Sequence, residues 1–304
     1  MTGTPIMIAS GAPPGGRAPQ DCPDAQAVGR AFAKCPDLAG ITGGIVSVQR
    51  LPGLSNQVFR LTSERGVFVL RLPHAGRPAL TDRWAELENL RLAAGIGLTP
   101  APLFADPGRG LLLLPEVAGT PGRPEPAQLG EVLSRLHGAR FQFANRRELA
   151  PWIARLRALV RARPDPEGLL KRLERLATRV EGKGAAGSSV FVPSHWDIIP
   201  GNCLLTPDGP VLIDWEYSAM GPPAWDLSYA VLELDYTAEE ERTLLAAYRQ
   251  TGGAPVGEAD VQAMKAVCDV VSALWALGQA DAMDPAAPLG RFALHRIERA
   301  ERLF

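Results

Sequence analysis

Short apolar stretches rich in Val, Ile, Leu and Phe, separated by turn residues, dominate the first third of the chain. They predict β-strands, because apolar runs of this length bounded by Gly, Pro, Asn or Ser are typical of strands. The predicted strands lie at residues 45–51, 58–62, 67–72, 103–105 and 111–117. We therefore expect a small antiparallel sheet, followed by a connector at residues 118–126.

Apolar residues recur at helical spacing through the rest of the chain. Thr237 and Glu240, three residues apart, form a capping box at the start of one predicted helix. The predicted helices lie at residues 28–35, 81–95, 129–136, 152–161, 168–180, 224–234, 237–248, 261–275 and 292–303. The Gly- and Pro-rich start predicts disorder. The expected division is a disordered tail at residues 1–20, a lobe at 21–117 and a larger, mainly helical lobe at 118–304.

A polar loop, two short apolar strands and an intervening turn lie together between residues 194 and 216. The turn residues Pro207-Asp208-Gly209 predict a hairpin. The hairpin would bring two polar groups close together. They are His195, Asp197 and Asn202 before its first strand, and Asp214 and Glu216 after its second.

The spacing of these polar residues suits phosphoryl transfer. His195, Asp197 and Asn202 form a His-x-Asp-x-x-x-x-Asn frame, which resembles the catalytic loop of protein kinases. Transfer needs a carboxylate near the attacking hydroxyl and oxygen ligands that hold Mg²⁺ against the phosphates. Asp197 is therefore the predicted base, and Asn202 and Asp214 are the predicted metal ligands. The alternative is a structural loop, because Asp and Asn are frequent in turns.

The residues of three motifs resemble those of the aminoglycoside phosphotransferase and choline kinase superfamily. They are His195-x-Asp197 through Asn202, Ile213-Asp214-Trp215-Glu216-Tyr217, and Gly221-Pro222-Pro223-Ala224-Trp225-Asp226-Leu227. The second motif is most similar to the bacterial choline kinase and thiamine kinase branch. The resemblance covers roughly residues 45 to 280. It implies an α+β, two-lobed protein-kinase-like fold, with a small antiparallel-sheet N-lobe and a larger mainly helical C-lobe.

On the nucleotide side, the resemblance implies a phosphate-binding turn at Ser55 and Asn56. Arg71 lies where kinases place a strand lysine that binds phosphates, and an arginine can hold phosphate oxygens bidentately. A helix carboxylate is expected to pair with Arg71. Glu86 is preferred because the family shows a Glu three residues before an Asn, and Glu88 stays open as the partner. A solvated helix face is the competing interpretation for both.

The resemblance also locates the other two ligand contacts. Backbone groups near Glu116 and Val117 are expected at the adenine. On the acceptor side, aromatic and acidic residues are interleaved after the hairpin, a combination that suits a cationic alcohol through cation–π attraction. Glu216, Tyr229 and Trp275 are the candidates for acceptor binding. Most aromatic residues of a helical lobe nevertheless belong to its core.

Other polar and sulfur-containing side chains are assigned structural roles. His137 follows a helical apolar stripe and is expected to be structural, and Asp226 is expected to brace the catalytic loop. Cys35 and Cys268 fall on apolar helical faces and are predicted core thiols.

Composition limits the possible partners. The net charge of −1 offers no electrostatic case for binding nucleic acid or an anionic membrane. The four cysteines form no Cys-x-x-Cys pair, and we see no membrane-spanning apolar run or signal peptide, so a cytoplasmic protein is expected. No Gly-x-x-x-x-Gly-Lys-Ser/Thr motif is present, which disfavours a P-loop enzyme.

These observations together predict a kinase that uses ATP and Mg²⁺ to phosphorylate a hydroxyl of a small-molecule alcohol. Choline or a similar amino alcohol is the favoured acceptor, and thiamine and an aminoglycoside are the alternatives. A non-catalytic, nucleotide-binding pseudokinase is the competing hypothesis, because the strand lysine is replaced by Arg71 and the loop before Asn56 is sparse in glycine. The sequence leaves the oligomeric state open.

Overall fold

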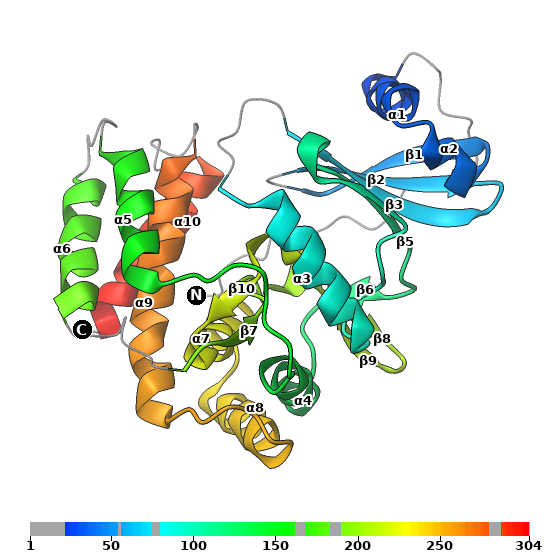
Figure 1. Ribbon diagram of the computed structural model, residues 1–304. Helices are drawn as coiled ribbons and strands as arrows, with labels where there is room; N and C mark the ends of the chain where they lie inside the picture. The colour runs from blue at the N-terminus through cyan, green and yellow to red at the C-terminus, as the bar shows by residue number, and fades with distance from the viewer. Residues whose placement is uncertain are drawn as a thin grey trace. The chain divides into compact units, whose positions relative to one another are not determined.

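The computed structural model describes residues 22–53, 56–74, 80–161, 168–182, 190–279 and 287–303. Contacts within the chain divide it into two units (Figure 1). Unit 1 comprises Met1–His74 and Leu103–Glu116, and unit 2 comprises Ala75–Pro102 and Val117–Phe304. The predicted disordered tail lies outside the described residues.

Unit 1 is a five-stranded antiparallel sheet with helices on one face. The strands follow the order β1-β2-β3-β5-β4. Their bounds are β1 Ile45–Leu51, β2 Asn56–Ser63, β3 Gly66–Pro73, β4 Phe104–Asp106 and β5 Leu111–Pro115, with a 3₁₀ turn η1 at Pro107–Arg109. Helices α1 (Pro23–Lys34) and α2 (Asp37–Thr42) bury Val28, Cys35 and Leu38 against Phe59 and Leu70 of the sheet. The five predicted strands are therefore confirmed, and α2 is an addition.

Unit 2 is mainly helical. Its helices are α3 Arg83–Gly95, α4 Pro126–His137, α5 Leu149–Val160, α6 Leu169–Gly182, α7 Pro223–Glu233, α8 Ala238–Gln250, α9 Glu258–Gly278 and α10 Pro288–Leu303. Its short strands are β6 Thr120–Pro121, β7 Val192–Ser194, β8 Cys203–Thr206, β9 Gly209–Leu212 and β10 Ala219–Gly221, with 3₁₀ turns η2 Pro200–Asn202 and η3 Trp215–Tyr217. The predicted helices and the β8–β9 hairpin are confirmed, whereas the pattern missed β6, β7 and β10.

The expected lobe at residues 21–117 differs from unit 1 in one segment. Residues 75–102, which include α3, group with unit 2. Polar contacts join α3 to the rest of unit 2; in one of them the Asn89 Nδ2 donates to the Ser218 carbonyl oxygen at 3.0 Å. The expected division of the chain into two lobes at residue 117 stays a prediction.

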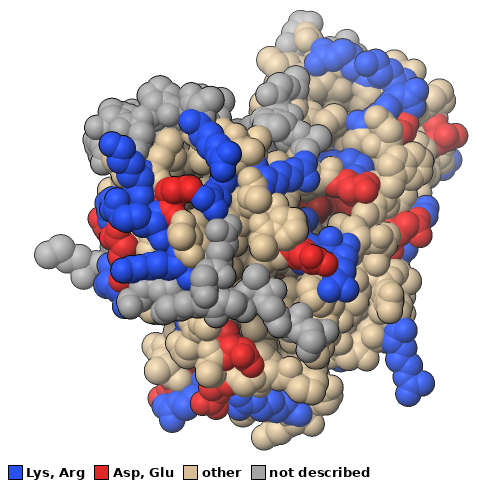
Figure 2. Space-filling view, turned by 60° about the vertical axis from the view of Figure 1, so that its left-hand side comes forward, with Lys and Arg blue, Asp and Glu red and all other residues tan. Residues whose placement is uncertain are grey.

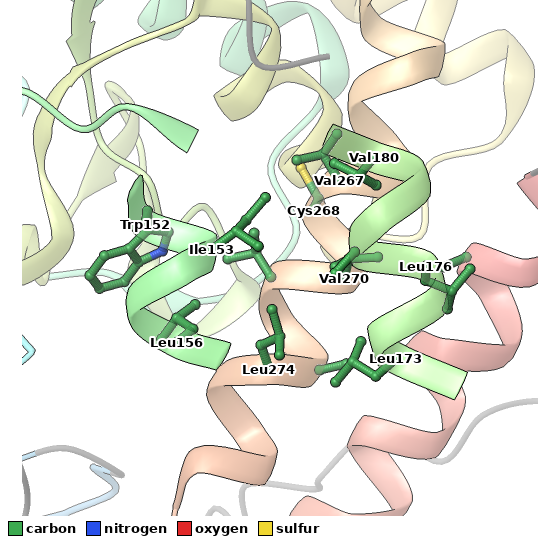
Figure 3. Packing of buried hydrophobic residues seen from close by; sticks show 14 of the residues in the cluster. Trp152, Ile153, Leu156, Leu173, Leu176, Val180, Val267, Cys268, Val270 and Leu274 are labelled. Atoms are coloured by element: carbon green, nitrogen blue, oxygen red, sulfur yellow. The ribbon is translucent and has the colours of Figure 1, made fainter. Parts of the chain in front are cut away.

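Helix α9 forms the centre of the core of unit 2. Side chains of α5 and α6, such as Ile153 and Leu176, pack against Val270 and Leu274 of α9 (Figure 3). By length and composition α9 could cross a membrane, contrary to the expectation that the chain contains no apolar run of that length. Because 83% of its most apolar window is buried, its hydrophobicity is explained by the core it occupies.

Surface charge is of both signs. The face in Figure 2 carries Lys and Arg side chains together with Asp and Glu side chains, as expected of a chain whose net charge is −1. Several are paired across the surface of unit 2, such as Arg172 with Glu301 at 2.7 Å. Such exposed pairs contribute little to stability individually.

Candidate active site

The β8–β9 hairpin places the two predicted metal ligands side by side. Cys203 pairs with Leu212 in the ladder, and one residue further on the Ile213 N–H donates to the Asn202 carbonyl oxygen at 3.0 Å. Asn202 and Asp214 therefore flank the same end of the hairpin. Asp214 leaves the strand in the left-handed region (φ 61°), which directs the chain into turn η3. A non-glycine residue in this conformation is uncommon and is often associated with a functional site.

Asp226 holds the loop that precedes the hairpin. Its carboxylate accepts the backbone N–H of His195 at 2.7 Å and that of Trp196 at 2.8 Å, and it contacts His137 Nε2 at 3.2 Å. Burial alone would raise the pKa of Asp226, but His137, the charge of His195 and the His195 N–H lower it overall. The predicted bracing role of Asp226 and the structural role of His137 are both seen in these contacts.

His195 connects the loop to the second strand of the hairpin. Its Nε2 lies 3.0 Å from the Ile213 carbonyl oxygen, and its Nδ1 accepts the Asp197 N–H at 3.3 Å. These partners require a proton on Nε2 and none on Nδ1, which is the neutral imidazole. Burial lowers the pKa of His195 to about 4, against a smaller opposing effect of Asp226. A neutral His195 thus binds the backbone at Asp197, in the loop before the hairpin, and at Ile213, just after its second strand.

Asp197 is held by Asn202. The Asn202 Nδ2 donates to the Asp197 Oδ2 at 2.8 Å and to the Asp197 carbonyl oxygen at 3.0 Å. Burial raises the pKa of Asp197 well above its usual range, and the nearby carboxylates of Asp214, Glu216 and Glu233 raise it further. Of these three carboxylates, Glu216 is paired with Arg83 and Glu233 with Arg296.

The donor set fits a magnesium ion. Because the amide nitrogen of Asn202 faces Asp197, its Oδ1 is the atom left to act as a ligand beside the Asp214 carboxylate. Within the described residues no group of three or more His, Cys, Asp or Glu side chains forms a metal cluster. Mg²⁺ commonly takes one or two carboxylates and completes its shell with phosphate oxygens and water. Asn202 and Asp214 are residues of the required kind.

The acceptor candidates lie on three elements of unit 2. Glu216, in η3, is buried and accepts the Arg83 Nη1 at 3.1 Å. Tyr229, on α7, stacks on Trp225 with ring centroids 5.8 Å apart. Burial raises the pKa of Tyr229, and the charges of Glu233 and Asp197 raise it further.

Trp275, the third acceptor candidate, contacts the residue that follows Glu216. Its Nε1 donates to the Tyr217 hydroxyl at 3.0 Å. Sequence reasoning did not assign Glu233 to the site, although it lies four residues after Tyr229 on α7 and so on the same helix face. That spacing was the available signal. Glu233 forms an ion pair with the buried Arg296 of α10.

The predicted nucleotide-binding residues of unit 1 lie on and after the sheet. Asn56 begins β2 and is buried, while Ser55 lies outside the described residues. Arg71, on β3, is opposite Val58 and Leu112 of the neighbouring strands and is 8% exposed. Their contacts with ATP remain predictions.

Glu116 closes the sheet after β5. Its N–H donates to the Val67 carbonyl oxygen at 3.1 Å, and its side chain binds Arg60 with Oε1 2.5 Å from Nε. That N–H is therefore engaged in the sheet, so an adenine contact would use the Glu116 carbonyl oxygen or the backbone of Val117. Val117 begins the next segment of unit 2.

The two candidate partners of Arg71 differ within α3. Glu86 is buried and lies 2.9 Å from the Arg83 Nη1, whereas Glu88 is exposed and binds Arg91 at 2.8 Å. Burial suits Glu86 better to a structural ion pair, and the pair with Arg71 stays a prediction.

An antiparallel sheet unit, a helical unit and a carboxylate-rich loop braced by a buried aspartate define a phosphotransferase of the protein-kinase-like fold. Comparison with known proteins agrees. Residues 47–267 match the model of the phosphotransferase enzyme family. Protein LicA of Haemophilus influenzae is 26% identical over 263 residues, which cover 83% of this chain and 78% of that protein.

Two solved structures are similar over most of the chain. One is a choline/ethanolamine kinase family protein from Mesorhizobium loti, with 31% identity, a TM-score of 0.74 and coverage of 91% of this chain and 94% of that one. The other is choline kinase LicA from Streptococcus pneumoniae, with 22% identity, a TM-score of 0.76 and coverage of 91% and 98%. The chain belongs to the phosphotransferase enzyme family, in its choline kinase branch.

Proposed function

We propose that the protein transfers the γ-phosphoryl group of ATP to the hydroxyl of choline or a similar amino alcohol, with Mg²⁺ as cofactor. The observation that carries the proposal is the environment of Asp197. Its carboxylate is half-buried and accepts the Asn202 amide at 2.8 Å, and the charges of Asp214, Glu216 and Glu233 raise its pKa. Family membership and the likeness to choline kinases support the same reaction.

Asp197 would orient the acceptor and take its proton. The hydroxyl oxygen forms a bond to the γ-phosphorus, the bond from that phosphorus to the β–γ bridging oxygen breaks, and the hydroxyl proton goes to the Asp197 carboxylate. Asn202 keeps the Asp197 Oδ2 in place through its amide. Asn202 and Asp214 would hold Mg²⁺, which supplies charge neutralisation on the phosphates.

On the nucleotide side, Asn56, Arg71 and the backbone near Glu116 and Val117 would contact ATP. Arg71 is suited to phosphate because a guanidinium presents paired donors. Glu86 would pair with Arg71, in keeping with its burial on α3. ATP binding is supported by relatives such as LicA, whose structure was determined in complex with AMP.

On the acceptor side, aromatic and acidic groups favour a cation. The charges of Glu233 and Asp197 raise the pKa of Tyr229, and Trp275 donates to the hydroxyl of Tyr217, the residue after Glu216. Aromatic faces and carboxylates attract a quaternary or primary ammonium group. The proposed acceptor is therefore an alcohol whose hydroxyl reaches Asp197 while its ammonium group lies among these side chains.

A coupled ADP-release screen over choline, ethanolamine, thiamine and aminoglycosides tests the proposal. We expect the highest kcat/KM with choline or ethanolamine. Turnover restricted to thiamine or an aminoglycoside would replace the acceptor, and absence of turnover with Mg-ATP and every alcohol would favour the pseudokinase alternative.

Two variants test the assigned roles. Asp197→Asn should lower kcat by about 10²-fold or more with little change in ATP affinity, as for loss of a positioned base. Asp208→Asn, on the exposed hairpin turn, is the matched control and should be unchanged. A normally active Asp197→Asn enzyme would contradict the role of the whole loop.

Asp214→Ala should abolish turnover and leave the fold intact. It should also remove the rise in melting temperature caused by Mg-ATP, since a ligand at about 100 Kd stabilises by about 2.7 kcal/mol. If Asp214 is instead only a structural anchor, Asp214→Ala should be destabilised, and Mg-ATP should not change the melting temperature of the wild type. Asn202→Ala should be milder and partly rescued by raised Mg²⁺.

A further inference from the structure

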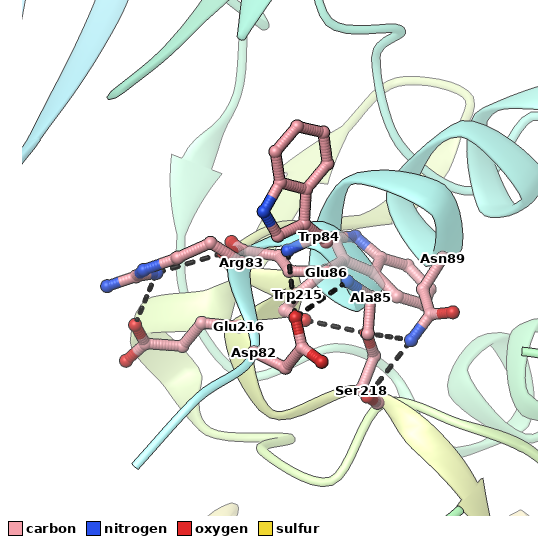
Figure 4. Close-up of polar contacts among 9 residues, drawn as sticks. All are labelled: Asp82, Arg83, Trp84, Ala85, Glu86, Asn89, Trp215, Glu216 and Ser218. Carbon is pink, nitrogen blue, oxygen red and sulfur yellow. Dashed lines mark hydrogen bonds and ion pairs between the residues drawn. The ribbon is translucent and has the colours of Figure 1, made fainter. Parts of the chain in front are cut away.

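One arginine at the start of α3 binds two buried carboxylates at once (Figure 4). The Arg83 Nη1 lies 2.9 Å from the Glu86 Oε2 and 3.1 Å from the Glu216 Oε2. Both glutamate side chains are only 3% exposed, whereas Arg83 is 21% exposed. Glu86 is one helical turn along α3, and Glu216 is 133 residues away in η3. Arg83 thus connects a nucleotide-side carboxylate to an acceptor-side one.

The first turn of α3 holds Arg83 in place. Asp82 caps the helix, its Oδ1 accepting the N–H of Trp84 at 3.0 Å and of Ala85 at 3.2 Å. A side-chain cap of this kind satisfies helix donors that would otherwise lack a partner within the helix. Because the backbone of Arg83 lies inside this capped turn, its guanidinium starts from a defined position. The neighbouring Trp84 is 66% exposed and takes no part in the bridge.

A second contact is made in the next turn of α3. The Asn89 Nδ2 donates to the Ser218 carbonyl oxygen at 3.0 Å and lies 3.1 Å from the Ser218 Oγ, which in turn donates to the Trp215 carbonyl oxygen at 2.7 Å. Residues 215–218 are therefore fastened to α3 at two points (Figure 4). This segment follows Asp214 directly, so its position decides where Asp214 and Glu216 lie.

Charge makes the bridge specific. Two carboxylates that share one nitrogen atom in a buried place repel each other strongly, since buried charges are screened far less than exposed ones. A guanidinium between them offsets that repulsion and also fixes direction through its planar donors. Removing the guanidinium would leave the carboxylates to move apart, and Glu216 lies on the shorter and less regular element.

We propose that Arg83 is a positioning residue of phosphoryl transfer. It acts through Glu216, and through the turn that carries Glu216, to keep the acceptor-side carboxylate and Asp214 in register with α3. The inference rests on the proposed function, because it assigns Glu216 to acceptor binding. A displacement of about 1 Å at such a group can cost about 10²-fold in rate.

Steady-state kinetics of substitutions on α3 test the inference. Arg83→Met, which keeps the apolar stem and removes every donor, should lower kcat/KM for the acceptor by about 10- to 100-fold. Arg83→Lys retains the charge but not the planar donors, and should recover part of that loss. Arg91→Met is the matched control, since Arg91 is on the same helix and its partner among the described residues is the exposed Glu88, at 2.8 Å. It should behave as wild type.

A double-mutant cycle separates positioning from mere stability. If Arg83 acts through Glu216, adding Arg83→Met to a Glu216→Gln enzyme should cost less than about threefold in kcat/KM, because the effects of coupled residues are not additive. A structural residue would lower the melting temperature and leave the kinetics of the folded enzyme unchanged. All variants are therefore assayed below the temperature at which circular dichroism first reports unfolding.

The outcomes are distinguishable. An active wild type matched by an equally active Arg83→Met enzyme would overturn this inference alone. Fully additive losses in the cycle would also overturn it, since Arg83 would then act independently of Glu216. A wild type that phosphorylates none of the alcohols would overturn the proposed function and this inference with it.

Discussion

His195 gives the protein a predictable sensitivity to acid. The imidazole is buried, with Nε2 donating to the Ile213 carbonyl oxygen at 3.0 Å and Nδ1 accepting from the Asp197 N–H at 3.3 Å. Burial lowers its pKa to about 4 in the folded protein, from an ordinary value of 6.5. Protonation would put a hydrogen on Nδ1, where the Asp197 N–H already points.

The size and sign of the effect follow from that difference in pKa. Because the unfolded chain binds the proton more tightly, stability is lost as pH falls from about 6.5 through about 4. A difference of about 2.5 units at about 1.36 kcal/mol per unit gives a loss of about 3 kcal/mol. Asp197 acts in the opposite direction, because its raised pKa makes the folded state gain stability as pH falls. The prediction therefore concerns the contribution of His195 alone.

Urea unfolding of wild type and His195→Gln isolates that contribution. Glutamine retains a nitrogen donor for Ile213 and cannot titrate. At about pH 7.5 wild type should be the more stable protein, and the difference should shrink by about 3 kcal/mol toward about pH 4. His295→Gln, at an exposed position on α10, is the control and should stay within about 0.5 kcal/mol of wild type.

A difference in unfolding free energy between wild type and His195→Gln that stays constant over this pH range would refute the reasoning. If His195→Gln does not fold, the histidine ring resonances of the wild type decide the matter instead. An NMR titration in which His195 protonates near its ordinary pKa would contradict the burial argument, whereas a midpoint near 4 would support it.

Two further predictions concern ATP and helix packing. Arg71→Ala should weaken Mg-ATP binding by about tenfold or more and change acceptor binding little. Arg50→Ala, on the exposed edge strand, is the control. An ATP complex in which Arg71 points to bulk solvent would contradict this prediction. Gly130→Ala should destabilise by about 1–3 kcal/mol in urea unfolding, because its Cβ would lie 2.5 Å from the Leu244 carbonyl oxygen. Gly29→Ala, with nothing within 4 Å, should be neutral or stabilising; equal effects at the two glycines would refute the packing argument.

Local features of the chain were predictable because their causes are local. The hairpin follows from two apolar runs around Pro207-Asp208-Gly209, and the capping box follows from Thr237 and Glu240, which are hydrogen-bonded in the structure. The spacing of Asp197 and Asn202 likewise determines that they can bond, since one loop carries both. Periodicity was sufficient for the long helices and for the strands of unit 1.

Some distant contacts were also within reach of the sequence, through the resemblance to a family. The bracing role of Asp226 was expected, and its carboxylate binds two N–H groups about thirty residues earlier in the chain. Short elements were not predictable. Strands β7 and β10 have three residues each and pair across 24 intervening residues, from Ser194 to Ala219, so neither carries a periodic pattern of its own.

The class of protein, the sheet, the helices and the loop that carries Asp197, Asn202 and Asp214 could all be predicted from residue patterns. The charges that surround that loop could not, because they come from elements distant in the chain. Arg83 reaches Glu216 across 133 residues, and Arg296 of α10 pairs with Glu233 of α7. The physical reason is that residue spacing governs contacts within a helix or a hairpin, whereas contacts between elements depend on how their buried faces pack.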